Sequence, residues 1–357
     1  MFKITGKIGS AICYVNEADL EVFEQVCKMC DYEFTKDSKI RIMPDVHAEK
    51  GSIIGITMTV TDKVVPNIVG ADLGCGIYSV NLGKGEIDLE KLDKAANHIP
   101  SGQSVWEEVQ ESFDFQELRC YEMLENVERL EKRLGTLGEG EHFIDVHRAT
   151  DGTNYLIIHS GSGNLGEQVA EIYQQIAVEL HKEKKSDSKK KEEMLRICKE
   201  QRYGEDVLEA MEKFFDAQEK ETIPENLRFL YGEFFDNYMH DVEICQRFAK
   251  RNREKIAEIL LERTGMTGSE GFHTVHNCID TKKMILRRGA IAAHEGEKAL
   301  ITINMCDGSL LAVGKGNPEW NNSAPMKYKV PGDNVDNMKD SVEIIDVMKQ
   351  VYHLNAE

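Results

Sequence analysis

The sequence of 357 residues predicts an α+β fold: one large domain, 1–357, with mixed sheets around a cleft and a helical insertion at about 167–262. Short strand-like runs separated by glycine turns fill the first and last thirds of the chain. The middle is helix-rich and highly charged, and its run 182–193 is too charged to be a buried strand. Sheet-forming segments therefore flank one helical segment, within a chain long enough to bury a large core.

Composition and charge exclude several classes of protein. No apolar run is long enough to cross a membrane, and the first residues lack a signal-peptide core, so we expect a cytoplasmic protein with no membrane partner. Nine cysteines, an odd number without a framework pattern, suit a reducing compartment. The formal net charge of -19 disfavours nonspecific nucleic-acid binding by the whole surface but is compatible with a local basic groove.

The first 43 residues predict a strand, an amphipathic helix and a second strand. The helix runs from about Glu17 to Tyr32 and places Val22 and Val26 on one face. Cys27 and Cys30 have the spacing of a redox or zinc pair. No second pair accompanies them, and helical spacing already explains Cys30 as part of the packing face, so we favour packing.

The segment 41–60 brings a carboxylate and an imidazole to the end of a strand. Asp45 and His47 are two residues apart, so in a regular strand they project to the same side. A carboxylate there can orient this imidazole or one in a neighbouring element. A turn-capping aspartate beside a surface histidine is the alternative. A turn at Gly51 and a strand over 53–60 follow.

The sequence VGADLGCG at 69–76 predicts a tight glycine-rich turn between two strands. It carries Asp72 and Cys75, and the glycines at 74 and 76 leave the backbone free to aim both side chains at one point. A thiolate beside a carboxylate is costly unless a cation lies between them, which favours metal binding. A buried cysteine beside a turn-forming aspartate is the alternative.

Two further glycine-rich segments adjoin predicted strands. GEGEHFID at 138–145 places Glu141, His142 and Asp145 at a strand start, where they are candidate metal or nucleotide contacts. HSGSGNLG at 159–166 follows a strand at 155–158, precedes a helix and matches a dinucleotide fingerprint. A Rossmann unit requires a second parallel strand about thirty residues later, where the charged run stands. We therefore predict that this turn does not bind a dinucleotide, and that its strand brings His159 to the cleft.

The last third returns to strands. His273 and His276 are three residues apart, so in an extended segment at most one of them reaches a shared site. The tail, 340–352, predicts a short amphipathic helix.

Five candidate ligands stand at strand ends or glycine turns. A thiolate, imidazoles and a carboxylate can together hold two divalent ions of intermediate softness, such as manganese or zinc. Paired metals serve phosphoryl and nucleotidyl transfer. We therefore expect a metal cleft formed by these residues: Asp72, Cys75, His142, His159 and His276.

The sequence resembles the RtcB family of RNA ligases. The motifs that carry the resemblance are IRIMPD at 40–45, GADLGCG at 70–76, GEGEHFI at 138–144, HSGS at 159–162 and GNPEWN at 316–321, with His276-Asn277. It implies joining of RNA ends that bear a 3′-phosphate or 2′,3′-cyclic phosphate to 5′-hydroxyl ends, with GTP and manganese. It also implies that a histidine is guanylylated before GMP passes to the RNA.

The resemblance assigns roles to individual positions. The five candidate ligands match the metal ligands of the family. Asp45 matches the carboxylate that orients the nucleophilic histidine. The positions that match guanylate contacts are Glu141, Asp145, Asn277, Asn304 and Ser309.

The chain departs from the family where the nucleophile is expected. The family's His-Gly-Ala-Gly-Arg segment follows Ser-Ala-Pro, but here 323–325 are followed at once by Met-Lys-Tyr-Lys. Glu141 replaces an asparagine that would face a phosphate, and Gly163 stands where the family usually has arginine. The interpretations are therefore an RtcB-type ligase, a catalytically impaired relative that holds metal and acts as a binding or regulatory protein, or a metal-dependent phosphoesterase.

Overall fold

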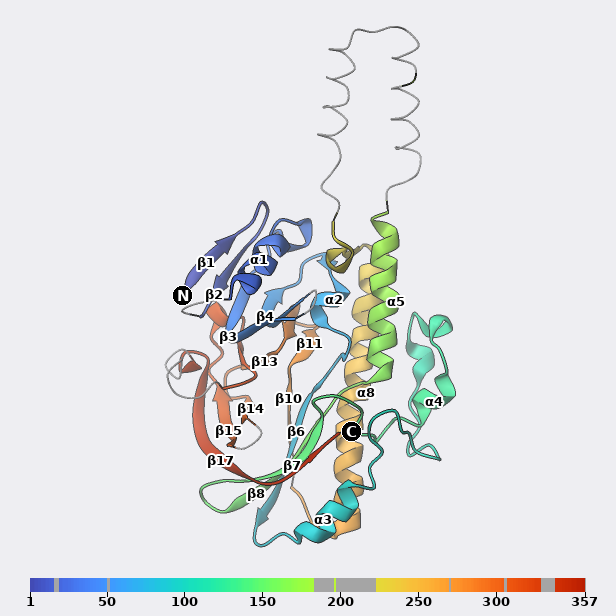
Figure 1. Cartoon of the computed structure of the whole chain (residues 1–357), viewed down its shortest axis with the longest axis vertical. Coiled ribbons are helices and arrows are strands. Elements are labelled where there is room, and N and C mark those ends of the chain that lie inside the picture. The colour runs from blue at the N-terminus through green and yellow to red at the C-terminus, as the bar shows by residue number, and fades with distance from the viewer. Residues whose placement is uncertain are drawn as a thin grey trace.

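The computed structural model describes residues 1–15, 19–49, 52–182, 196, 223–269, 271–304, 307–328 and 338–356. It has an α+β fold in which two large sheets lie beside a pair of long helices (Figure 1). This architecture confirms the predicted fold class. Residues 183–222 of the predicted insertion lie outside the described residues, apart from Arg196.

The first sheet has six strands in the order β1-β2-β3-β4-β12-β11. Helix α1, Leu20–Met29, packs on it through a buried face that includes Val22 and Val26, so the amphipathic helix is confirmed. The strands are β1 (Phe2–Thr5), β2 (Ser10–Cys13), β3 (Ile40–Glu49), β4 (Ser52–Thr59), β11 (Asn277–Asp280) and β12 (Ile285–Arg288).

The second sheet has seven strands in the order β10-β6-β8-β7-β17-β15-β14. It curls until its edge strands approach each other, and the backbone N–H of Leu300 in β14 donates to the Thr274 hydroxyl in β10 at 3.0 Å. The strands are β6 (Gly76–Lys84), β7 (Phe143–Arg148), β8 (Thr153–Ser160), β10 (Phe272–Val275), β14 (Lys298–Asn304), β15 (Gly308–Gly314) and β17 (Val342–Asn355).

Strand alternation gives this sheet two different faces. Ile144 and Val146 of β7 pack against the helical layer, whereas Phe143 and Asp145 point to the concave side. Each fully buried aliphatic side chain contributes about 1.5–3 kcal/mol relative to exposure. Apolar burial thus holds the sheet on its helices, while the concave side carries both apolar side chains, such as Phe143, and polar ones, such as Asp145.

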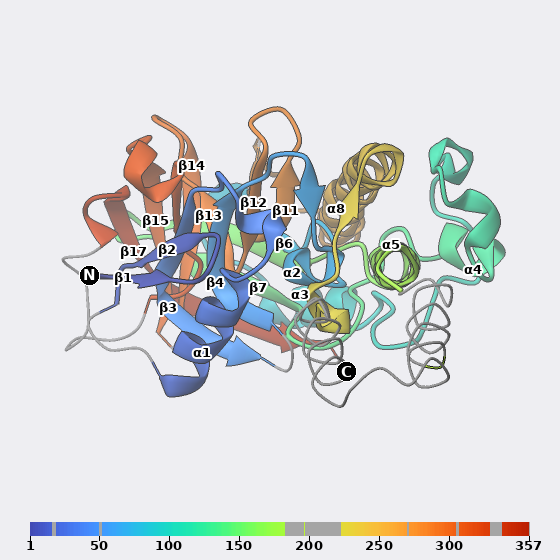
Figure 2. The same cartoon turned by 90° about the horizontal axis from the view of Figure 1, so that it is seen from above.

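The helical layer is formed by α5 (Asn164–Leu180) and α8 (Glu233–Thr264), which lie side by side (Figures 1 and 2). The short helix α3 (Leu89–Ala96) packs near the end of α8, and α4 (Val127–Glu131) lies beyond α5. The smaller elements are α2 (Pro66–Val69) and the strand pairs β5 (Lys63–Val64) with β9 (Leu230–Tyr231) and β13 (Ala290–Ala292) with β16 (Ser323–Pro325). Among the described residues, no helix is both long and apolar enough to cross a membrane.

Three local predictions were wrong. The tail is strand β17 rather than a helix, because pairing with β15 on one side and β7 on the other satisfies its backbone. The turn at 69–76 is entered from α2, which begins at a proline, and not from a strand. Asp45 is buried while His47 is exposed, because the β3 register shifts between residues 42 and 47.

Strand β8 runs antiparallel to both of its neighbours, β6 and β7. A dinucleotide fold requires parallel strands around its glycine-rich turn. The segment 159–166 therefore lacks the parallel sheet that a Rossmann site requires. This agrees with the sequence, in which a charged run stands where the second parallel strand would have to be.

Candidate metal centre

The turn between α2 and β6 is held against α8 by its glycines. Gly74 has φ of 80°, and a Cβ atom there would lie 2.9 Å from the Ala249 Cβ and from the Gln246 Cα. Its N–H donates to the Asn277 carbonyl at 2.7 Å. Only glycine combines this backbone conformation with so close an approach. The turn therefore places Asp72 and Cys75 at a fixed position in front of the helix.

Three histidines reach the same position from separate elements: His142 precedes β7, His159 lies near the end of β8, and His276 lies between β10 and β11. The Cys75 Sγ is 3.4 Å from the His159 Nε2 and 3.5 Å from the His142 Nε2. The ligand atoms form two groups, Cys75-His159-His276 and Asp72-Cys75-His142, each within 4.8 Å. The structure thus brings together all five residues that the sequence singled out, and it leaves His273 outside, stacked on Tyr78.

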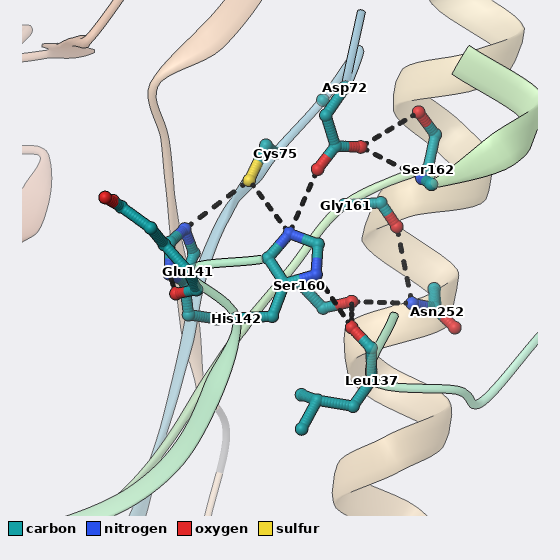
Figure 3. A network of polar contacts seen from close by, with 12 residues as sticks. Asp72, Cys75, Leu137, Glu141, His142, Ser160, Gly161, Ser162 and Asn252 are labelled. Atoms are coloured by element: carbon teal, nitrogen blue, oxygen red, sulfur yellow. Dashed lines mark hydrogen bonds and ion pairs between the residues drawn. The ribbon is translucent and has the colours of Figure 1, made fainter. Parts of the chain in front are cut away.

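Backbone carbonyls orient two of the imidazoles. The Nδ1 of His142 lies 2.8 Å from the Leu137 carbonyl, and the Nδ1 of His159 lies 2.9 Å from the Glu141 carbonyl. Each carbonyl can only accept, so each Nδ1 carries the proton and each Nε2 presents a lone pair to the cluster. Figure 3 shows the side chains of Asp72, Cys75 and His142 directed at one another.

This arrangement is unsatisfied without a cation. The His142 Nε2 faces the Asp72 carboxylate at 3.0 Å, and the His159 Nε2 faces the His276 Nε2 at 2.9 Å. Lone pairs directed at lone pairs repel unless a proton or a metal ion lies between them. The donor set of thiol, imidazole and carboxylate matches ions of intermediate softness, so these residues fit a transition metal.

Burial shapes the ionisation of the cluster. It raises the pKa of the Cys75 thiol, and the Asp72 carboxylate raises it further. Burial, together with the neighbouring imidazoles, lowers the pKa of His159, and burial lowers that of His276 to about 4. Burial also opposes ionisation of Asp72, but the neighbouring His142 ring and the Gly163 N–H together outweigh it and lower the pKa of this carboxyl. A divalent ion would favour the thiolate and the neutral imidazoles together.

A buried guanidinium supports the cluster from α8. The side chain of Arg253 is fully buried, and its Nη1 donates to the Gly74 and Ser160 carbonyls, each at 2.7 Å. These carbonyls directly precede Cys75 and directly follow His159. Asn252 adds bonds from its Nδ2 to the Ser160 Oγ and the Gly161 carbonyl (Figure 3). The two ligand-bearing turns are thus fixed to one helix.

The five positions expected to contact a nucleotide have different surroundings. Asp145 and Ser309 are buried on the concave side of the curled sheet and both bond to His147, at 3.0 and 2.7 Å, so they are covered in this structure. Glu141 is exposed and lies 3.3 Å from the Lys327 Nζ. Asn277 follows His276 and accepts from the Gly289 N–H at 3.3 Å. The Asn304 side chain lies outside the described residues.

Asp45 lies on β3 and is buried, and its Oδ2 accepts from the Lys327 N–H at 2.9 Å. Lys327 follows β16, so the backbone that comes directly after the Ser-Ala-Pro strand reaches this carboxylate. Asp45 therefore faces the position in the chain where the family's histidine segment is expected and missing.

Sequence reasoning did not identify His147 or Arg253, and it did not place His353 beside Asp145. His147 is two residues after Asp145 on the same strand face, and this spacing could have identified it. The Nδ1 of His353 lies 2.6 Å from the Asp145 Oδ1 because β17 pairs with β7, which no local pattern reveals. Arg253 stands in a charge-rich helix where one buried arginine has no distinctive spacing.

The fold and the cluster together define an α+β protein with a buried candidate transition-metal centre. The chain belongs to the tRNA-splicing ligase RtcB family, whose sequence model matches residues 25–325. It is 24% identical over 325 residues to RNA-splicing ligase RtcB1 of Escherichia coli strain ATCC 25922, and 25% identical to RNA-splicing ligase RtcB of strain K12. Each alignment covers 78% of this chain and 71% of the relative. The family resemblance is therefore confirmed, and at family level the function is that of an RNA ligase.

Proposed function

We propose that this protein acts on broken RNA, joining 3′-phosphate or 2′,3′-cyclic phosphate ends to 5′-hydroxyl ends with GTP and manganese. The observation that carries the proposal is the convergence of Asp72, Cys75 and three histidines in one cluster. Family membership supports the choice of RNA ends as the substrate.

The two ligand groups share Cys75, so these residues would hold two neighbouring ions, with Cys75 belonging to both ligand sets. Manganese accepts this mixture of nitrogen, oxygen and sulfur ligands, and zinc would compete for it. When bound, such ions supply charge stabilisation at a transferring phosphorus. The protein's part is to hold the ligands: Arg253 and Asn252 fix the turns, and the Leu137 and Glu141 carbonyls fix the imidazoles.

Five residues are proposed for the nucleotide from the family resemblance: Glu141, Asp145, Asn277, Asn304 and Ser309. Asp145 and Ser309 would have to exchange their bonds with His147 for bonds to a ligand. Glu141 would repel a phosphate unless a cation offsets its charge. Lys327, 3.3 Å away, is a cation in that position.

One observation favours a second candidate, a relative that holds metal and RNA ends but joins them slowly or not at all. Asp45, the proposed orienting carboxylate, receives the Lys327 N–H, and the family's nucleophile segment is missing between Pro325 and Met326. Loss of a covalent nucleophile typically costs many orders of magnitude in rate. Under this second candidate, ligation by this chain is weak or absent.

The test uses the full chain with manganese, GTP, an RNA bearing a 3′-phosphate and a second RNA with a 5′-hydroxyl. Joined product that requires GTP and disappears in Cys75→Ala supports the ligase. Binding of manganese and of the 3′-phosphate end without joined product identifies the second candidate. Release of inorganic phosphate without GTP would instead support a phosphoesterase.

A further inference from the structure

A small hollow adjoins the candidate metal centre where β8 leads into α5. It is lined by Arg133, Gly138, His142, Ser162 and Gly163, among others. The His142 Nε2 and the Ser162 Oγ both lie within hydrogen-bond distance of the Asp72 carboxylate, at 3.0 and 3.4 Å. The hollow is therefore next to a proposed metal ligand. The positive end of the α5 dipole also lies here, since α5 begins at Asn164.

Arg133 brings a buried and under-used cation to this hollow. The residue is 5% exposed, and its one side-chain hydrogen bond within the described structure runs from Nη2 to the Gln103 Oε1 at 3.4 Å. Its Nε is buried without a partner, and no described carboxylate forms an ion pair with it. Burial and the charge of Arg129 lower the pKa of this guanidinium, while Glu139 and Glu167 raise it. A buried charge with unfilled donors is costly, so an anionic ligand is the expected partner.

The backbone at Gly163 explains why the cation comes from Arg133. Gly163 has φ of 54° and ψ of -134°, a region that only glycine adopts readily. A Cβ atom there would meet a single neighbour within 4 Å, the Arg133 Nη1 at 3.8 Å. Residue 163 therefore cannot carry the arginine that the family usually has without a change of backbone. The guanidinium of Arg133 lies in the space that such a side chain would enter.

We infer that Arg133 binds the terminal phosphate of an RNA 3′ end at the mouth of this hollow. The inference rests on the proposed function, since it names the group of the RNA that this side of the site receives. A guanidinium matches a phosphate because it offers parallel N–H donors in a fixed plane. The hollow itself, about 10 Å³, holds no more than one water molecule, so the phosphate would lie outside it, at its mouth. The Asp72 carboxylate at its edge would repel the phosphate, so binding should be strongest when a divalent ion offsets that charge.

The test measures fluorescence anisotropy of two labelled RNA oligonucleotides of one sequence, one with a 3′-phosphate and one with a 3′-hydroxyl, on the manganese-loaded full chain. The wild type should bind the 3′-phosphate more tightly. Arg133→Gln should weaken that binding by roughly 10- to 100-fold, the range for a charge-assisted hydrogen-bonding pair, and leave the 3′-hydroxyl RNA unaffected. Arg133→Lys should keep part of the preference. The matched control is Arg129→Gln, which removes a nearby cation that contacts the Gln103 carbonyl and should change neither affinity.

Melting temperature and manganese content are measured for each variant, and Arg133→Lys supplies the test if the glutamine variant does not fold. A full preference for the 3′-phosphate in both Arg133 variants would overturn the inference while the proposed function stands. A wild type that does not distinguish the two RNAs would contradict the proposed RNA-end chemistry. In that case, competition between inorganic phosphate and the labelled RNA decides whether Arg133 forms an anion site. Displacement of RNA by phosphate from the wild type but not from Arg133→Gln supports the site. Equal displacement from both proteins excludes it.

Discussion

Replacing Arg253 by methionine tests whether the candidate metal centre is held in place from α8. The guanidinium donates to the Gly74 and Ser160 carbonyls, which adjoin Cys75 and His159 in the chain. Methionine fills much of the space but offers no donor, so two buried carbonyls lose their partner. The change therefore removes the support of the turns and leaves every proposed ligand intact.

The magnitude follows from those two bonds. Hydrogen bonds to charged groups contribute about 1.5–3 kcal/mol each, and each unsatisfied carbonyl costs about 1–3 kcal/mol. Removing the buried charge recovers part of this, because burying a guanidinium is itself unfavourable. We expect Arg253→Met to lower the free energy of unfolding by about 3 kcal/mol and manganese affinity by roughly 10- to 100-fold, as for other residues that orient metal ligands.

The assay is urea unfolding of the metal-free protein together with a manganese titration. Lys250→Met is the control, because this lysine lies on the same helix with its side chain 60% exposed; it should stay within about 0.5 kcal/mol of the wild type. Arg253→Lys keeps a charge but not the fork geometry and should fall between the two. If Arg253→Met changed stability by less than about 1 kcal/mol and left manganese affinity intact, the proposed support would be wrong.

Three further outcomes are expected. Cys75→Ala should lose bound metal because both ligand groups include this sulfur; unchanged metal content by elemental analysis would contradict the shared ligand. Manganese affinity should rise with pH, because burial and Asp72 raise the pKa of the Cys75 thiol, which must lose its proton to bind; a titration that shows no proton release would exclude the thiolate. GTP labelled at the α-phosphate should give little or no covalent band on a denaturing gel; a strong band lost in His353→Ala would reveal a substitute nucleophile oriented by Asp145.

The sequence was most informative where chemistry and local backbone signals coincide. Each of the five candidate ligands stands beside a glycine turn or a strand end, so residue type and position together indicate the cluster. The fold class also followed from local patterns, since the amphipathic period of α1 and the short strand-like runs are properties of neighbouring residues.

The tertiary structure decided what depends on partners distant in the chain. The tail has a period that fits a helix, but β15 and β7 offer it two edges of unpaired backbone, and strand pairing with both outweighs that preference. Asp45 and His47 separate because of a shift in register that depends on β4.

The polar residues around the candidate metal centre and on the concave side of the sheet also depend on contacts between distant segments. Asp145, His147 and Ser309 form one buried network because side chains of β7 and β15 reach each other across β17 on the concave side of the curled sheet. Arg253 and Arg133 acquire their roles from carbonyls and a glycine that are 30 to 179 residues away along the chain. A sequence states which groups can ionise, donate or ligate. Which of them share one buried space is set by packing between distant segments, and that packing is a property of the whole fold.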